Sequence, residues 1–161
     1  MTQIKVGISD LNIATNGDSL VTFALGSCVG ICIYDNVHKI AGLSHIMLPA
    51  SSGFNAVGDQ KHKFADLAIP ELVKQMEYRG AKRICMKAKI AGGAKMFATP
   101  ANSPLGSIGD RNVVAVKYML GQLRIPIIAE DTGKDYGRTQ YFDSATGLMK
   151  IKSVNRGEAT Y

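Results

Sequence analysis

One cysteine, one histidine and one threonine in this chain stand where they can act together. The stretch TFALGSCVGICIYD places Thr22 six residues before Cys28, and GLSHIMLP carries His45 further on. A thiolate is a strong nucleophile, and a neighbouring imidazole can accept the thiol proton and later deliver it to a leaving amine. The three residues together indicate cysteine-based acyl chemistry, with the hydroxyl of Thr22 orienting the imidazole ring.

The pair Gly26-Ser27 directly precedes the candidate nucleophile. A glycine leaves the backbone free to turn, so this pair can aim N–H groups at a developing oxyanion. A structural interpretation competes with the chemical one, because free cysteines are among the most buried residues. Taken singly, Cys28, His45 and Thr22 each favour a place in the core. Only their combination favours a catalytic site.

Two apolar strands must position the thiol and the imidazole: one begins at Cys28, and the other, 40–48, contains His45. If Asp35 and His38 close a two-residue loop, the antiparallel register places Cys28 directly opposite His45. Opposed residues share a face of the sheet, with Cβ atoms about 4.5–5.5 Å apart. A slip of one residue would send His45 to the other face, so the argument depends on the loop.

The remaining elements follow from apolar periodicity and turn residues. Asn16-Gly17 predicts a turn with two positive φ angles, and Pro70 predicts a kink or a second start within a helix. Cys32 and Cys85 are assigned to core strands, and His38 to solvent. The expected strands are 3–9, 11–15, 19–25, 28–34, 40–48, 83–90, 126–130, 140–143 and 148–154, and the expected helices are 61–78 and 110–123.

These elements predict an α/β (α+β-like) fold: a single domain over 1–161, made of mixed β-sheets with two main helices. The Cys-His-Thr site is expected to be papain-like and to sit on a β-hairpin. The β-rich first 50 residues argue against a doubly wound design.

Length and cysteine usage narrow the class of protein. A chain of 161 residues and 17.2 kDa is most economically one domain. No apolar run approaches the roughly 20 residues that span a bilayer, and no secretory signal opens the chain, so a cytoplasmic protein without membrane insertion is expected. Three cysteines make no disulfide framework, and no second Cys/His pair supplies metal ligands. Neither a metal nor another cofactor is expected.

Positive charge is concentrated in the second half of the chain. Residues 1–80 hold six Lys/Arg against seven Asp/Glu, whereas residues 81–161 hold thirteen against six. A solvated basic face explains this pattern, and so does attraction to an acidic partner. Nucleic acid is not expected as the partner, because no recognition motif or aromatic interleaving accompanies the charge.

Four motifs in this order resemble the CheD family, the chemoreceptor glutamine deamidases of bacterial and archaeal chemotaxis. They are TFALGSCVGICIYD, GLSHIMLP, AGGAKMF and IGDRN, and the resemblance covers nearly the whole chain. It implies Cys28 as the nucleophile, His45 as the general base and acid, and Thr22 as the residue that orients the ring. The implied reaction converts selected glutamine side chains on the cytoplasmic helices of chemoreceptors to glutamate through a cysteine thioester.

The resemblance also implies a protein partner, the phosphatase CheC, which competes with receptor for the active-site region and is stimulated by binding. The alternative is a mainly non-catalytic module that regulates CheC and receptors. Phe97, which ends AGGAKMF, is a candidate partner contact. Gly92 and Gly93 are expected to permit a tight turn beside the site, and Arg111 and Asn112 of IGDRN to cap and brace the following helix.

Overall fold

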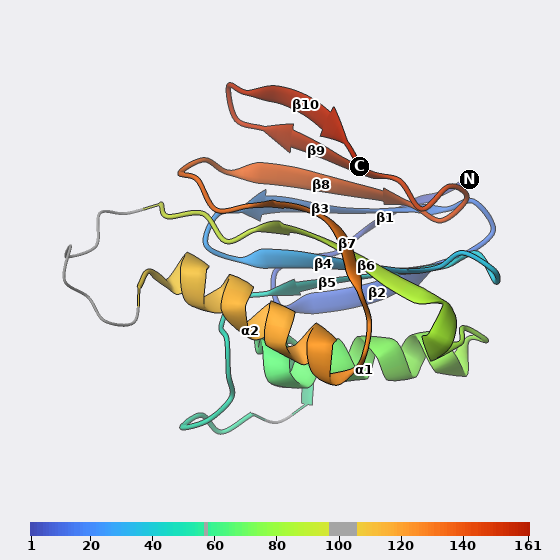
Figure 1. Cartoon of the computed structure of the whole chain (residues 1–161), viewed down its shortest axis with the longest axis horizontal. Coiled ribbons are helices and arrows are strands. Elements are labelled where there is room, and N and C mark those ends of the chain that lie inside the picture. Colours follow the sequence, from blue (N-terminus) through green and yellow to red (C-terminus); the bar gives the residue numbers. More distant parts are fainter. Residues whose placement is uncertain (57, 97–105) are drawn as a thin grey trace.

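The computed structural model describes residues 1–56, 58–96 and 106–161, and it has three layers. Two five-stranded sheets pack face to face, and two helices cover the far side of one of them (Figure 1). We call the sheet between the other two layers the central sheet and its neighbour the outer sheet. The predicted combination of mixed sheets with two helices is confirmed.

Both sheets mix parallel and antiparallel pairs of strands, and each sheet has one parallel pair. The outer sheet has the order β1 (Gln3–Lys5), β3 (Ser19–Leu25), β8 (Arg138–Asp143), β9 (Met149–Ser153) and β10 (Gly157–Thr160). The central sheet has the order β2 (Asp10–Ala14), β5 (Ile40–Ile46), β4 (Val29–Asp35), β6 (Met86–Gly92) and β7 (Ile127–Thr132).

The middle strand of the central sheet, β4, is apolar on both faces because both faces are covered. From β4, Ile31 and Ile33 face the helices, whereas Cys32 and Tyr34 face the outer sheet. Every residue of this strand is buried. A strand covered on both sides reads as a continuous apolar run rather than an alternating one. The prediction that Cys32 is a core residue is therefore confirmed.

Helix α1 (Ala65–Tyr78) runs without interruption through Pro70, so the expected second start at that proline is wrong. The break lies earlier, at Phe64, where the short helix η1 (Gly58–Lys63) gives way to α1. Helix α2 (Ile108–Gln122) begins with a capping box, in which Ser107 and Asp110 bond each other's backbone N–H. Such a cap fixes where a helix starts.

The loop between β4 and β5 differs from the predicted one. Asp35 pairs with Ile40, so four residues turn the chain and His45 lies opposite Gly30 rather than opposite Cys28. The buried carboxylate of Asp35 organises this loop, because it accepts hydrogen bonds from the N–H groups of Val37 and His38. The register moves by two residues, which returns every side chain to its original face.

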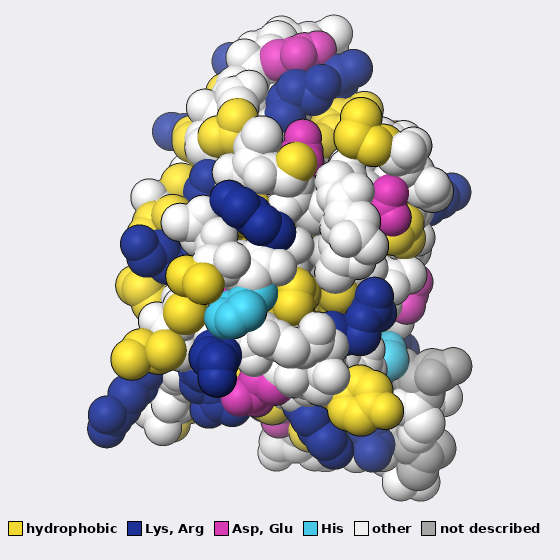
Figure 2. Space-filling view, turned by 90° about the vertical axis from the view of Figure 1, so that its right-hand side faces the viewer, with side chains coloured by type: hydrophobic (Ala, Val, Ile, Leu, Met, Phe, Trp, Pro, Cys, Tyr) yellow, Lys and Arg dark blue, Asp and Glu magenta, His cyan; other side chains and the backbone are white. Residues whose placement is uncertain are grey.

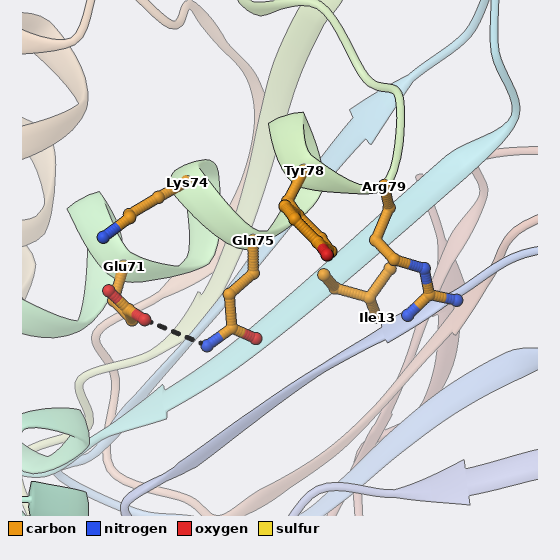
Figure 3. Close-up of a pocket in the computed structure, with 6 residues that line it drawn as sticks. All are labelled: Ile13, Glu71, Lys74, Gln75, Tyr78 and Arg79. Carbon is orange, nitrogen blue, oxygen red and sulfur yellow. Dashed lines mark hydrogen bonds between the residues drawn. The ribbon is translucent and has the colours of Figure 1, made fainter.

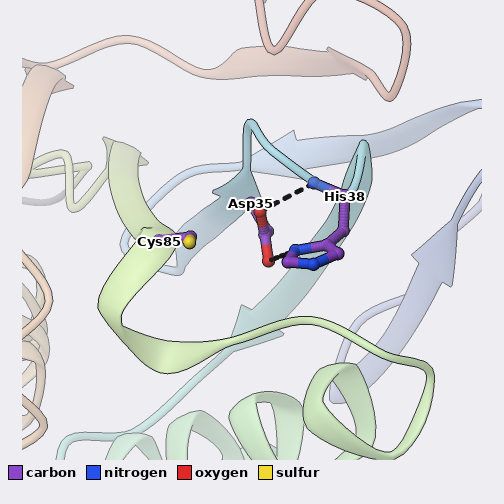
Figure 4. A group of neighbouring side chains, drawn as sticks. All are labelled: Asp35, His38 and Cys85. Carbon is purple, nitrogen blue, oxygen red and sulfur yellow. Dashed lines mark hydrogen bonds and ion pairs between the residues drawn. The ribbon is translucent and has the colours of Figure 1, made fainter.

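Figure 4 shows how the side chain of His38 folds back against Asp35. Its Nδ1 lies 2.7 Å from Asp35 Oδ2, which also accepts the N–H of Lys82. Burial raises the pKa of Asp35, but these donors and the loop N–H groups outweigh it and lower the pKa overall. His38 is thus exposed, as expected, and its ring is also bonded to Asp35. Cys85 is half-buried, in the short helix η2 (Arg83–Cys85), so its assignment to a core strand is wrong.

Candidate active site

The three predicted residues come from both sheets. His45 lies on β5 of the central sheet, and Cys28 lies in the loop that leads into β4. Thr22 lies on β3 of the outer sheet and reaches His45 across the space between the layers, with Oγ1 2.6 Å from Nδ1. The structure therefore joins Thr22 to His45 directly, although they belong to different sheets.

The bond between Thr22 and His45 fixes the tautomer of the ring. The hydroxyl of Thr22 donates its single hydrogen to the carbonyl oxygen of Val6, 2.7 Å away. That oxygen can then only accept at its other contact, so Nδ1 of His45 must carry the ring hydrogen. The lone pair of the neutral imidazole is consequently on Nε2, the nitrogen that a general base would use.

Nε2 of His45 is buried and has no hydrogen-bond partner among the described residues. The ring is fully buried, and burial lowers the pKa of His45 from 6.5 to about 4. The imidazole is therefore neutral at neutral pH and keeps an unused acceptor. Buried polar atoms are usually satisfied, so an unpaired one deserves a functional explanation.

Cys28 is the accessible member of the group. It is half-buried and packs against the apolar core between the two sheets, on the same face as His45. Burial raises the pKa of the Cys28 thiol, and its own backbone N–H lowers it in part. Within the described residues, no hydrogen bond joins Cys28 to His45. His45 lies opposite Gly30, so the two residues are diagonal neighbours, offset by two positions along the strand. This offset replaces the predicted direct opposition of Cys28 and His45.

A local distortion carries the chain from β3 to Cys28. The pairing of β3 with β8 shifts register between Thr22 and Leu25, and Ala24 has φ 60°. The N–H of Gly26 donates back to the carbonyl of Ala24, at 3.1 Å. This N–H is therefore already used. Those of Ser27 and Cys28 donate to no other residue within the described part of the chain.

The motif AGGAKMF holds this loop through its backbone. The N–H of Gly93 donates to the carbonyl of Cys28, and the N–H of Ala94 donates to that of Gly26, each at 2.8 Å. Gly92 has φ 107°, and a Cβ there would collide with the Cys28 carbonyl oxygen. Glycine is thus required both for the backbone conformation and for the close approach. A tight turn beside the site was expected. Its direct hydrogen bonds to residues 26–28, which we call the cysteine loop, were not expected.

Asn112 supplies a second hold on the same loop. From the start of α2 its amide nitrogen donates to the carbonyl of Ser27 at 2.9 Å and to that of Met47 at 3.0 Å. It thus ties the segment before Cys28 to the one after His45. The motif IGDRN was expected to brace its own helix, which Asp110 does, but the role of Asn112 could not be read from the sequence.

The family of this chain can be stated from sequence comparison. A family model described as CheD chemotactic sensory transduction matches residues 47–153. The chain belongs to the CheD family. Proteins of Clostridium botulinum (strain Hall) and Clostridium novyi (strain NT) are 52% and 50% identical over 155 residues, covering 96% of this chain and 95% of each relative. Both are named "Probable chemoreceptor glutamine deamidase CheD".

Among solved structures, the chain is similar to a Bacillus licheniformis hypothetical protein, YfiH. The two share 17% identity at a TM-score of 0.42, and the match covers 74% of this chain and about half, 51%, of the other. A likeness of this strength carries no argument about the CheD-family site.

A cavity of about 610 Å³ in this CheD-family chain lies away from the candidate site (Figure 3). It is a groove along the outside of α1, where Tyr78 and Arg79 lie beside Ile13 of β2, and it holds none of the three catalytic candidates. Among the described residues, neither α-helix is long and apolar enough to cross a membrane. The candidate partner contact Phe97 lies outside the described residues.

Asp35, His38 and Cys85 place potential metal-ligand atoms within 4.8 Å of one another (Figure 4). The two oxygens of Asp35 already accept four hydrogen bonds that hold the loop. A cation would have to displace some of them, so this cluster is explained by the turn it stabilises.

Proposed function

We propose that this chain is a chemoreceptor glutamine deamidase, acting in the cytoplasm as one domain over 1–161 with a papain-like Cys-His-Thr site. The observation that carries the proposal is the fixed tautomer of His45. Thr22 accepts from Nδ1 and leaves the basic Nε2 unpaired on the face that bears the half-exposed Cys28. The names of the curated relatives support the same reaction and the same class of substrate.

The proposed reaction begins when the sulfur of Cys28 attacks the carboxamide carbon of a glutamine and the thiol proton moves to Nε2 of His45. Collapse of the tetrahedral intermediate breaks the carbon–nitrogen bond, and the departing ammonia takes the proton from His45. A water molecule then attacks the thioester, passing a proton to Nε2 and returning the thiol. Glutamate is released, with atoms and charge balanced.

Two backbone groups are suited to the developing oxyanion. Among the described residues, the N–H groups of Ser27 and Cys28 donate to no other residue, whereas that of Gly26 is engaged with Ala24. Donors that are already oriented stabilise a developing negative charge without reorganisation. We assign Ser27 and Cys28 to this role, and we assign Gly26 to the turn and to the hydrogen bond with Ala94.

The decisive experiment compares Cys28→Ala with Cys85→Ala. Each variant is co-expressed with a chemoreceptor, and mass spectrometry reads glutamine and glutamate at the receptor's modification sites. We expect Cys28→Ala to abolish conversion and Cys85→Ala to retain it, because only Cys28 faces His45. Conversion that persists in Cys28→Ala would remove the nucleophile from the proposal.

A second proposed role is binding of a CheC-type phosphatase at the same end of the molecule. Two exposed apolar side chains lie at the cysteine loop: Met47, whose carbonyl accepts from Asn112, and Met96, which lies against Gly26. Such side chains at a functional loop are typical of a protein contact. The Cys28→Ala variant should still bind CheC and lose it when receptor is added. If receptor does not compete, the two partners use different surfaces.

A further inference from the structure

A cationic pocket of about 510 Å³ opens beside the segment that holds the cysteine loop. It is lined by Lys95, Lys134, Asp135, Tyr136 and Arg156. Three of these five side chains are cationic and one is anionic, so the pocket carries an excess of positive charge. A concave site of this charge is complementary to a carboxylate or another anion.

The cations of this pocket are not neutralised by the protein. Lys117 and Lys152, elsewhere on the surface, are each paired with a glutamate. In the described part of the chain no such carboxylate pairs with Lys95, Lys134 or Arg156. Basic side chains are also spread over the opposite end of the molecule (Figure 2), so charge alone would not single out this place. What distinguishes this pocket is that its cationic side chains have no ion-pair partner among the described residues.

A buried arginine lies next to the aromatic side of the pocket. The guanidinium carbons of Arg138 and Arg156 lie 4.6 and 5.2 Å from the ring centre of Tyr136. Arg138 is 2% exposed, and its Nε donates to Asp131 at 2.8 Å. Both of its terminal nitrogens are without a partner among the described residues. Arg138 does not line the pocket, so Arg156 is the guanidinium that a bound carboxylate could pair with there.

The pocket is connected to the proposed nucleophile by consecutive backbone bonds. Gly93 donates to the carbonyl of Cys28, and two residues later the N–H of Lys95 donates to the carbonyl of Lys134, each at 2.8 Å. Since an extended chain spans at most about 3.5 Å per residue, the rim of the pocket lies within roughly 10 Å of the cysteine backbone. On a helix this distance spans about seven residues, or two turns.

We propose that this pocket binds acidic side chains on the receptor helix that presents the glutamine to Cys28, within about two turns of that glutamine. The pocket would thereby help to choose which glutamines are deamidated. The proposal rests on the proposed deamidase function for its substrate. Lys95, Lys134 and Arg156 supply the charge, and Tyr136 holds the guanidinium groups in place.

The test replaces Lys95, Lys134 and Arg156 together with glutamine. A matched control replaces Arg83, Lys117 and Lys152, which removes the same charge from side chains that already have carboxylate partners. Both are made in the Cys28→Ala background, and binding of a fluorescent chemoreceptor cytoplasmic fragment is measured against salt concentration. We expect the pocket variant to bind at least about tenfold more weakly and with a shallower salt dependence. Equal affinity of the two variants would overturn the proposal.

Activity separates this proposal from the function on which it rests. With Cys28 present, the pocket variant should raise KM for the receptor fragment and leave kcat within about twofold, because the pocket does not touch the reacting atoms. If the unaltered protein binds through the pocket but converts no glutamine, the deamidase assignment fails and the pocket stands. If glutamine is converted and KM is the same in the pocket variant and the control variant, the pocket proposal is wrong and the deamidase function stands. Thermal unfolding of each variant verifies that it is folded.

Replacing acidic residues of the receptor fragment gives an independent test. Glutamine in place of the glutamates and aspartates within two turns of the target should weaken binding to the intact pocket. The same change should add little in the pocket variant, since the partners would already be gone. Additive losses would mean that the acidic residues bind elsewhere.

Discussion

At the scale of single residues, the role proposed for Thr22 depends on where its single hydroxyl hydrogen goes. Its hydroxyl is committed to the Val6 carbonyl, so its oxygen can only accept from Nδ1 of His45. A catalytic histidine needs one nitrogen held in this way for the other to act as a base. In the proposed mechanism Thr22 is a positioning residue, and its contribution depends on the hydroxyl rather than on its size.

We expect Thr22→Val to reduce kcat about tenfold to hundredfold, because losing a buried hydrogen bond of about 1.5–3 kcal/mol frees the ring and its tautomer. Thr22→Ser keeps the hydroxyl and should retain most of the activity. The measurement is kcat for a chemoreceptor fragment with both variants. Similar kcat values for the valine and serine variants would contradict the orienting role.

The resting state of Cys28 gives a second prediction at this scale. Burial raises the pKa of the Cys28 thiol and lowers that of His45, so the free protein holds a neutral thiol and a neutral imidazole. The rate of alkylation of Cys28 by iodoacetamide should therefore still be rising with pH at pH 9. Peptide mass spectrometry reads Cys28 separately from Cys85. A plateau below pH 7 would mean that a thiolate–imidazolium pair exists in solution.

At the scale of elements, two segments distant in sequence bond the cysteine loop. The residues just after β6 bond it through Gly93 and Ala94, and the start of α2 bonds it through Asn112. The inner face of the β4–β5 pair is shaped at the same place by Gly30, which lies opposite His45. A Cβ at Gly30 would collide with the side-chain amide of Gln140 on β8.

Asn112→Ala should weaken the attachment of α2 to the cysteine loop. The change leaves the carbonyls of Ser27 and Met47 without a donor, which we expect to lower the free energy of unfolding by about 1–3 kcal/mol and to reduce kcat. Urea unfolding and kcat are measured beside Arg111→Ala, an exposed neighbour on the same turn. If both variants behave alike, Asn112 does not hold the loop.

At the scale of the whole molecule, the space between the two sheets keeps His45 dry. The imidazole is neutral in the folded protein down to about pH 4 but takes up a proton below pH 6.5 when unfolded. Its contribution to stability is therefore complete above pH 6.5 and is lost as the pH falls toward 4. At about 1.4 kcal/mol per pKa unit, the loss is roughly 3 kcal/mol.

This pH dependence can be measured by urea unfolding between pH 7 and pH 4.5. The unaltered protein should lose about 2 kcal/mol more than His45→Gln over this range, because glutamine does not titrate. The comparison removes the contribution of the carboxylates, which both proteins share. Parallel curves would show that His45 is not buried as a neutral ring in solution.

The sequence by itself determined the features that depend on near neighbours in the chain. The apolar run of β4, the core place of Cys32 and the bounds of β3 follow from local pattern. So does the sharing of a face by Cys28 and His45, which survived the wrong loop length because an error of two residues restores the face. The identity of the catalytic candidates belongs here as well, since it rests on residue type and motif order.

Only the tertiary structure decided the rest, because it depends on segments distant in sequence. A buried carboxylate at Asp35 set the four-residue loop, and the packing of two sheets brought Thr22 to His45. Asn112 reaches Ser27 across 85 positions of the chain, and no local pattern encodes that distance. The pKa of His45 and the unpaired donors of Arg138 likewise follow from burial, which exists only once the layers have closed.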